Sequence, residues 1–250
     1  MIQWKSSVTA IAALSLMSVA LPARTEAAYL IMPSDPDNAA FRSLVAGFLG
    51  EAVDYYDASA GTPTVTELQA YKGVFTWTNS TYSNSTLLGD NLAAYVDGGG
   101  RVVLGAFTTY ASGSHLGGAI MTSAYSPVTS PTGSNAFISD SYSGDGVTSL
   151  WTGVASYGAF YRDNVILQGT GILDGTFADG SIAAAYRPDG LVVYLGGMET
   201  LTQTTGDSAR LLANALQGVS AAEVPEPATF GFAGLGLAIL GVVTRLRKKA

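Results

Sequence analysis

A single histidine limits the acid–base chemistry open to this chain of 250 residues. His115 follows Ser114 in the segment Ser-Gly-Ser-His-Leu-Gly-Gly. A serine hydroxyl becomes a nucleophile when a histidine, itself oriented by a carboxylate, takes its proton. Ser114 and His115 are therefore the candidate catalytic pair. Ordinary loop residues are the alternative, because sequence neighbours seldom face each other as such a pair must, and no Gly-x-Ser-x-Gly elbow is present.

Oxygen-bearing side chains gather in one short segment that could hold a hard cation. Asp140 and Asp145 enclose Ser141 and Ser143, and carboxylate and hydroxyl oxygens are ligands that Ca²⁺ accepts. The spacing does not match the twelve-residue calcium loop, so acids of a solvated turn are the alternative. One histidine and no cysteine exclude ordinary zinc sites and every thiol mechanism. We predict no cofactor.

The charge of the chain excludes one class of partner. Between Ala28 and Glu223 there are six basic and 17 acidic residues, a net charge of −11. Binding to nucleic acid needs Lys and Arg against the phosphates, so no nucleic-acid partner is expected. Charged residues make up only 12% of the chain, and the surface must then be mostly uncharged and polar. Such a surface suits contact with polysaccharide.

The N-terminal segment has the layout of a secretory signal. Lys5 is followed by an apolar stretch over 8–21 and by small residues that end near Ala27. This order predicts a signal peptide over 1–27, and a buried N-terminal helix is the alternative. The globular domain is then expected over 28–222, long enough for one domain with its own core.

The C-terminal segment carries three features in succession. Val224, Pro225, Glu226 and Pro227 form an extended linker, because the prolines stop a helix. The stretch 228–244 has no charge and is near the lower limit for a transmembrane helix. The basic residues that come next should stay cytoplasmic, which places the domain outside; they are Arg245, Arg247, Lys248 and Lys249.

Residues 223–250 resemble the PEP-CTERM sorting signal of Gram-negative bacteria. The resemblance implies an exosortase as partner and cleavage near Pro225 to Pro227. It implies anchoring in the inner membrane facing the periplasm, followed by release to the cell surface or beyond. It also implies association with exopolysaccharide or biofilm. A plain C-terminal anchor is the alternative, because length and charge alone do not separate the two.

Between these ends, apolar runs and helical spacings alternate. Helices are predicted over 39–49, 66–71, 87–96 and 208–216, the first between a capping Asn38 and Gly50. Strands are predicted over 28–32, 52–56, 73–77, 101–105, 165–171, 182–186 and 191–195. Turns are predicted over 173–177 and 178–180, and small elements within 106–149. The alternation predicts an α/β fold with a mostly parallel sheet.

Three segments of the domain resemble the class I glutamine amidotransferase-like fold, a flavodoxin-like three-layer sandwich. They are Val96 to Leu104, Asp179-Gly180 with Leu191 to Gly197, and Ala209 to Leu216. In that family a nucleophilic Cys lies on a tight turn after the central strand. Here Phe107 takes that elbow position, so the resemblance extends to the scaffold and excludes the thiol chemistry.

Ligands of open α/β sheets bind beyond the carboxyl ends of the strands. In this chain those ends are 33–35, 77–80, 106–109 and 197–199, with the aromatic residues Trp77, Phe107 and Tyr110. A neutral rim of this kind could bind sugar hydroxyls or another small ligand. The favoured interpretation of Trp77 and Phe107 is core packing. The sequence therefore predicts a non-catalytic envelope protein, with a hydrolase or a small-ligand-binding module as the alternative.

Overall fold

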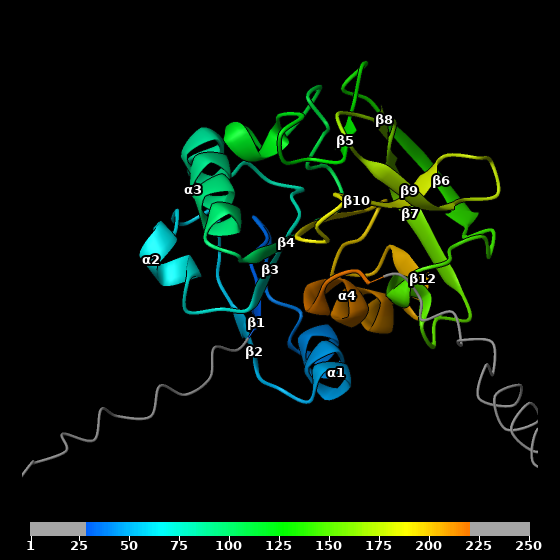
Figure 1. Cartoon of the computed structure of the whole chain (residues 1–250), viewed down its shortest axis with the longest axis horizontal. Helices are drawn as coiled ribbons and strands as arrows, with labels where there is room; N and C mark the ends of the chain where they lie inside the picture. Colours follow the sequence, from blue (N-terminus) through cyan, green and yellow to red (C-terminus); the bar gives the residue numbers. More distant parts are fainter. Residues whose placement is uncertain (1–28, 221–250) are drawn as a thin grey trace, which may run out of the picture.

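The computed structural model describes residues 29–220, which form a mixed α/β domain around a seven-stranded sheet (Figure 1). The sheet order is β2-β1-β3-β4-β11-β10-β9. The strands are β1 (Tyr29–Ile31), β2 (Val53–Tyr55), β3 (Gly73–Thr76), β4 (Arg101–Leu104), β9 (Ile172–Thr176), β10 (Ile182–Tyr186) and β11 (Val192–Leu195). The first five in the sheet order pair in parallel, and β10 and β9 extend the sheet as antiparallel strands. The parallel part has the strand order of flavodoxin-like folds.

Helices cover both faces of this sheet. On one face α1 (Ala39–Leu49) packs beside α4 (Ser208–Gln217), and on the other lie α2 (Val65–Leu68) and α3 (Ser85–Asp97) (Figure 1). Two separate cores result, one with α1 and α4, the other with α3. Along β4 the side chains alternate between them, Val103 in the first core and Val102 and Leu104 in the second. The predicted α/β fold with a mostly parallel sheet is confirmed.

The first helix begins and ends where its capping residues predict. The Asn38 side chain accepts a hydrogen bond of 3.1 Å from the Phe41 backbone N–H, which satisfies a free donor of the first turn. Gly50 ends the helix at φ 69°, in the left-handed region that glycine adopts without strain.

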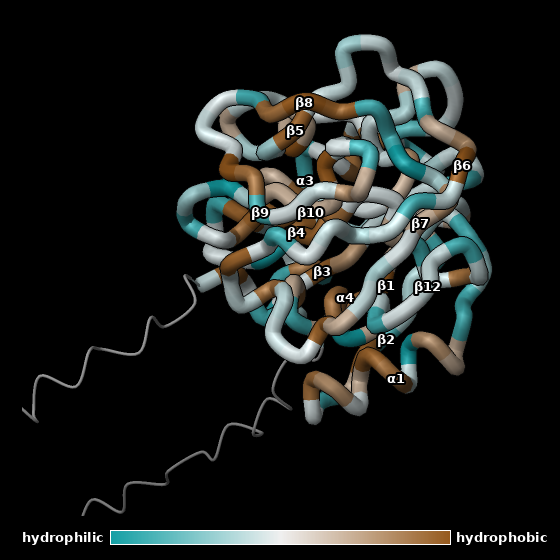
Figure 2. The backbone as a smooth tube through the Cα atoms, turned by 90° about the vertical axis from the view of Figure 1, so that its right-hand side faces the viewer, coloured by the Kyte–Doolittle hydropathy of each residue, from teal (hydrophilic) through white to brown (hydrophobic). Residues whose placement is uncertain are grey.

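A second, smaller sheet lies beside the main one. It contains β6 (Asn135–Ser141), β7 (Tyr157–Asp163) and β12 (Thr204–Gly206), in the antiparallel order β12-β7-β6 (Figure 2). The strands β5 (Val128–Thr129) and β8 (Ile166–Leu167) form a separate pair. Two 3₁₀ turns, η1 (Ala119–Met121) and η2 (Ser149–Trp151), complete the described elements. Residues 106–149 therefore hold small elements, as predicted.

Two sequence predictions are wrong in detail. The strand predicted over 165–171 is only the two residues of β8. The turn predicted over 173–177 is the edge strand β9, in which Asp174 and Gly175 face the packed interior. A Cβ at Gly175 would lie 2.6 Å from Cζ2 of Trp151, so this glycine makes room for an indole ring and does not form a turn.

The predicted signal peptide at 1–27, the transmembrane helix at 228–244 and the basic tail lie outside the described residues. Within 29–220, no helix has the length and apolar character needed to span a bilayer.

Candidate functional site

The chain turns sharply after the central strand β4, and Phe107 lies at that turn. Its φ is 63°, and it is the one non-glycine residue within 29–220 with a positive φ. A bulky residue in this region is strained, and such strain persists only where the surroundings enforce it. Two backbone contacts hold the turn against neighbouring strand ends, because Ala106 N donates to Met198 O and Thr78 N donates to Ala106 O. The elbow predicted at Phe107 is thus present in the backbone.

Asp163, the last residue of β7, fixes this elbow from the other side. Its Oδ1 accepts from the Phe107 backbone N–H at 3.2 Å and from Asn135 Nδ2 at 2.6 Å. Its Oδ2 accepts from the backbone N–H and the hydroxyl of Thr109, at 3.2 and 2.7 Å. Burial raises the pKa of Asp163, and these four donors oppose part of that rise. One buried carboxyl therefore joins the second sheet to the strained turn.

The ring of Phe107 lies at the centre of an aromatic cluster. Its centroid is 5.4 Å from that of Tyr110, 4.9 Å from Tyr161 and 6.2 Å from Phe137. The ring of Phe137 meets Tyr110 and Tyr161 nearly edge-on, at interplanar angles of 80° and 81°. Phe107 is only 4% exposed, whereas Phe137 is 53% exposed. The cluster thus leads from the buried elbow to the surface.

A small open cavity of about 100 Å³ lies against this cluster. Its lining residues are Thr78, Asn79, Phe107, Tyr110, Ser114 and Phe137. Among residues 29–220, no Asp, Glu, Lys, Arg or His lines this cavity. The exposed Asn79 side-chain amide makes no hydrogen bond within residues 29–220, although its backbone N–H donates to Asp35. The site can therefore offer an aromatic surface and uncharged polar groups to a ligand.

Ser114 lines this cavity, but His115 does not. The exposed His115 ring makes one hydrogen bond within the described residues, between Nδ1 and the Gly113 carbonyl oxygen at 3.2 Å. Ser114 Oγ lies 3.5 Å from Thr81 Oγ1. No hydrogen bond joins Ser114 to His115 or to a carboxylate in the part of the chain described, so the arrangement that a serine nucleophile requires is not assembled there.

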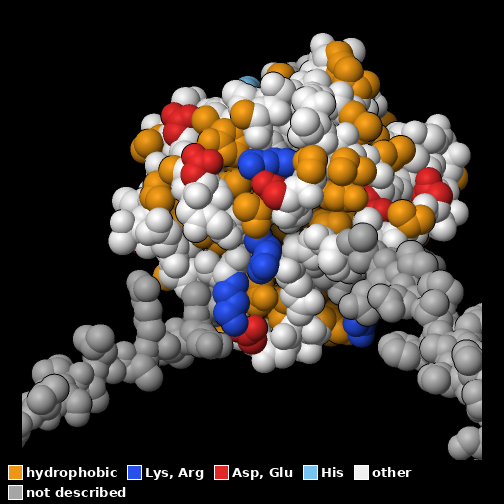
Figure 3. Space-filling model, viewed as in Figure 1, with side chains coloured by type: hydrophobic (Ala, Val, Ile, Leu, Met, Phe, Trp, Pro, Cys, Tyr) orange, Lys and Arg blue, Asp and Glu red, His pale blue; other side chains and the backbone are white. Residues whose placement is uncertain are grey.

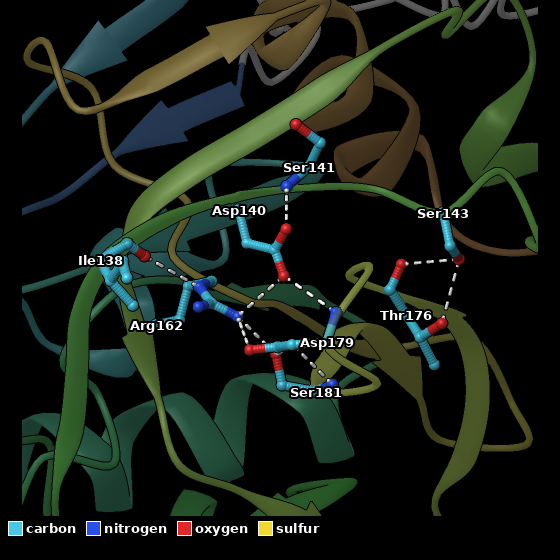
Figure 4. Close-up of polar contacts among 8 residues, drawn as sticks. All are labelled: Ile138, Asp140, Ser141, Ser143, Arg162, Thr176, Asp179 and Ser181. Atoms are coloured by element: carbon cyan, nitrogen blue, oxygen red, sulfur yellow. Dashed lines mark hydrogen bonds and ion pairs between the residues drawn. The ribbon is translucent and has the colours of Figure 1, made fainter.

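Asp140 takes part in an ion-pair network around the buried Arg162 (Figure 4). Arg162 Nη1 lies 2.7 Å from Asp179 Oδ2 and 3.6 Å from Asp140 Oδ2, and it donates to Ser181 Oγ at 2.7 Å. Burial alone would raise the pKa of Asp179, but hydrogen bonds from Ser181 and Arg162 lower it to about 2. The network joins β6 and β7 to the turn between β9 and β10.

Asp145 faces a different partner. Its carboxylate accepts from the backbone N–H and the hydroxyl of Thr176, at 2.9 and 2.8 Å. Asp140 and Asp145 therefore contact different residues of one segment, Asp179 in the turn after β9 and Thr176 at the end of β9. Residues 29–220 contain no group of three or more His, Asp or Glu placed to hold a metal ion. A calcium site at these two residues stays a prediction.

The predicted strand ends do meet at one edge of the sheet. Ser34 Oγ lies 2.7 Å from Thr78 Oγ1, and Asp35 Oδ2 accepts from Asn79 N at 2.8 Å. Trp77 is 1% exposed, and its indole N–H donates to Thr200 Oγ1, so it is a core residue.

Sequence reasoning missed the residues that the second sheet adds to this site: Asn135, Phe137, Tyr161 and Asp163. The segment Tyr157–Asp163 is almost wholly apolar or small up to its last two residues, so no alternation marks one face. Its aromatic residues, which are typical of strands, were the one feature that could have predicted a strand here.

The sorting residues Val224, Pro225, Glu226, Pro227, Arg245 and Arg247 lie outside the described residues. The family comparison covers them: residues 223–248 match the PEP-CTERM protein-sorting motif. None of the curated proteins matches the chain.

Three solved structures resemble the domain at low sequence identity. A cytoplasmic protein from Salmonella typhimurium has 12% identity and a TM-score of 0.51, over 76% of this chain and 98% of that one. A GMP synthase protein from Thermoplasma acidophilum has 10% identity and a TM-score of 0.47, over 76% and 92%. A glutamine amidotransferase from Thermotoga maritima has 10% identity and a TM-score of 0.43, over 68% and 74%. At these identities the likeness concerns the fold alone.

Proposed function

We propose that this chain is exported, processed by an exosortase and delivered outside the cell. There its domain associates with exopolysaccharide and has no catalytic role. The observation that carries the proposal is the motif at 223–248. Under it, residues 1–27 direct export, 28–222 form the working domain, and 228–244 hold the chain in the inner membrane until cleavage. The acidic, sparsely charged composition supports an extracytoplasmic role.

The non-catalytic part of the proposal is supported by the elbow. A phenyl ring fills the position where a nucleophile would stand in an amidotransferase-like fold, and it is buried in an aromatic cluster. Phenylalanine can neither attack a carbonyl nor transfer a proton. The surface of the domain fits a role in contacts, because charged side chains form only scattered small groups among hydrophobic and uncharged atoms on the face in Figure 3.

Co-purification with exopolysaccharide tests the proposal. The full chain is compared with a chain carrying Pro225→Ala and Pro227→Ala, and each is followed in cytosolic, membrane and extracellular fractions. We expect the native chain in the extracellular polysaccharide fraction and the variant in the inner membrane. Equal distribution of the two chains, or a native chain absent from the polysaccharide fraction, would contradict the proposal.

A hydrolase built on Ser114 and His115 is the alternative function. It predicts that the purified chain cleaves ester or glycosidic bonds and that His115→Ala abolishes the activity. The proposal predicts that the native chain and this variant release no product from the same substrates.

A further inference from the structure

The cavity beside the elbow combines an exposed aromatic ring with polar groups that carry no charge. Phe137, which is 53% exposed, lines this cavity together with Asn79 and Ser114. An aromatic face binds the C–H face of a flat, partly apolar ring, and amides and hydroxyls bind the groups on its edge. We infer that this cavity is a binding site for one uncharged pyranose ring of a glycan. That the glycan is an extracellular one rests on the proposed function.

The position of Phe137 follows from an irregularity in its strand. The pairing of β6 with β7 shifts register between Phe137 and Asp140, so two residues of β6, Ile138 and Ser139, oppose the single residue Phe160 of β7. Such a bulge turns side chains away from the regular alternation, and bulges are frequent next to binding sites. Phe137 and Ile138 are consequently both exposed, at 53% and 62%, and only Phe137 lines the cavity.

The surroundings hold the aromatic surface in place before a ligand arrives. Tyr110 and Tyr161 meet the Phe137 ring nearly edge-on, and the buried Phe107 ring packs against all three. Phe107 is fixed in turn by the strained elbow and by Asp163. A surface that is already ordered loses little conformational entropy on binding. This low cost lets a ligand that makes few contacts, such as a single sugar ring, bind measurably.

Size and charge select among ligands. Typical pockets for drug-sized molecules measure roughly 300–1,000 Å³, so a cavity of about 100 Å³ suits one ring with the rest of the chain outside. No ionised side chain lines the cavity, and acidic residues outnumber basic ones in the domain. An acidic sugar would therefore meet repulsion without a compensating cation, whereas a neutral sugar would not.

Saturation-transfer NMR on the full chain in detergent tests the site. The probes are glucose, galactose, mannose and N-acetylglucosamine with their β-linked disaccharides, together with galacturonate and phenol. We expect transfer to ring protons of at least one neutral sugar. Phe137→Ala should weaken binding about five- to tenfold, and Asn79→Ala severalfold. Ile138→Ala is the matched control, because Ile138 is the next residue and is also exposed but does not line the cavity, and it should leave affinity within about twofold.

The inference is overturned if no neutral sugar binds, or if Phe137→Ala and Ile138→Ala bind alike. It is also overturned if galacturonate binds as tightly as the neutral sugars, since the site would then accept an anion, or if phenol alone binds, since the site would then be purely apolar. A site that fails these tests in a chain correctly sorted and found with exopolysaccharide refutes the site alone. A site that passes them in a chain that stays in the cytosol refutes the proposed function alone.

Discussion

Replacing the carboxyl of Asp163 should release the elbow that it holds. Asp163→Leu keeps a similar side-chain volume but leaves four donors without an acceptor: the backbone N–H groups of Phe107 and Thr109, the Thr109 hydroxyl and the Asn135 amide. The hydroxyl can rotate toward another acceptor, but the two backbone groups cannot move without the turn. Each buried unsatisfied donor costs about 1–3 kcal/mol, so the two backbone groups alone should cost the variant roughly 2–6 kcal/mol of unfolding free energy.

The matched variant Asp163→Asn should behave differently. Burial raises the pKa of Asp163, which means that the fold favours the neutral carboxylic acid relative to the unfolded chain. The amide of this variant carries no charge and keeps one acceptor oxygen, which can serve two of the four donors, so the loss should be about half that of the leucine variant, roughly 1–3 kcal/mol. For a domain of this size the melting temperature falls by about 2–4 °C per kcal/mol, so the Leu and Asn variants should be clearly separated.

Urea unfolding followed by circular dichroism provides the assay, repeated from pH 4 to pH 7. A raised folded-state pKa gives stability that is present at low pH and lost as the pH rises through that pKa. The native chain should thus lose stability relative to Asp163→Asn between pH 4 and pH 7, while charges common to both chains cancel. Equal stability of the Leu and Asn variants at pH 7, or a pH trend of the opposite sign, would refute the role given to Asp163.

Three further outcomes follow from local contacts. Gly89→Ala should destabilise the domain by about 1–3 kcal/mol, because the added Cβ would lie 1.8 Å from Gly117 O. Gly47→Ala should instead stabilise α1 by about 0.4–1 kcal/mol, because nothing lies within 4 Å of the added Cβ. Thermal unfolding of both variants tests this contrast. Asn38→Ala should cost about 0.5–2 kcal/mol through the lost helix cap, measured by urea unfolding, and an unchanged midpoint would argue against the cap. The pKa of Asp179 is lowered to about 2, so this carboxylate stabilises the fold above its ordinary pKa, and the effect is lost as the pH falls toward 2. In urea unfolding, Asp179→Asn should be less stable than the native chain at pH 6 and equally stable near pH 2. A difference in stability that widens on acidification would contradict this.

The parallel sheet could be predicted from the sequence because its strands are buried on both faces. The segments Arg101–Leu104 and Val192–Leu195 are nearly continuous apolar runs, which are typical of central parallel strands. Their order along the chain also placed Phe107 at the turn after the central strand, and its φ of 63° confirms that position.

The second sheet could not be predicted in the same way. Its strand Tyr157–Asp163 packs on both sides, so it shows no alternation, and 15 residues separate it from its partner strand Asn135–Ser141. The site depends on that pairing, since Phe137 reaches the elbow through the bulge and Asp163 through the strand end. The residues near each of these positions in the sequence do not indicate either contact. Similarly, Asp174 and Gly175 predict a turn, because Asp-Gly is a common turn sequence. The structural reason for the glycine is the indole ring of Trp151, which is distant in the sequence and packs against Gly175.

Exosortase processing can be tested by mass spectrometry of the C-terminus of the protein recovered outside the cell. In a strain with its exosortase intact, we expect a terminal peptide that ends close to Pro225 or Pro227 and lacks the uncharged stretch 228–244. In a strain without the enzyme, that stretch should persist on a chain kept with the membrane. Recovery of the same external chain from both strains, uncut through Ala250, would contradict the account.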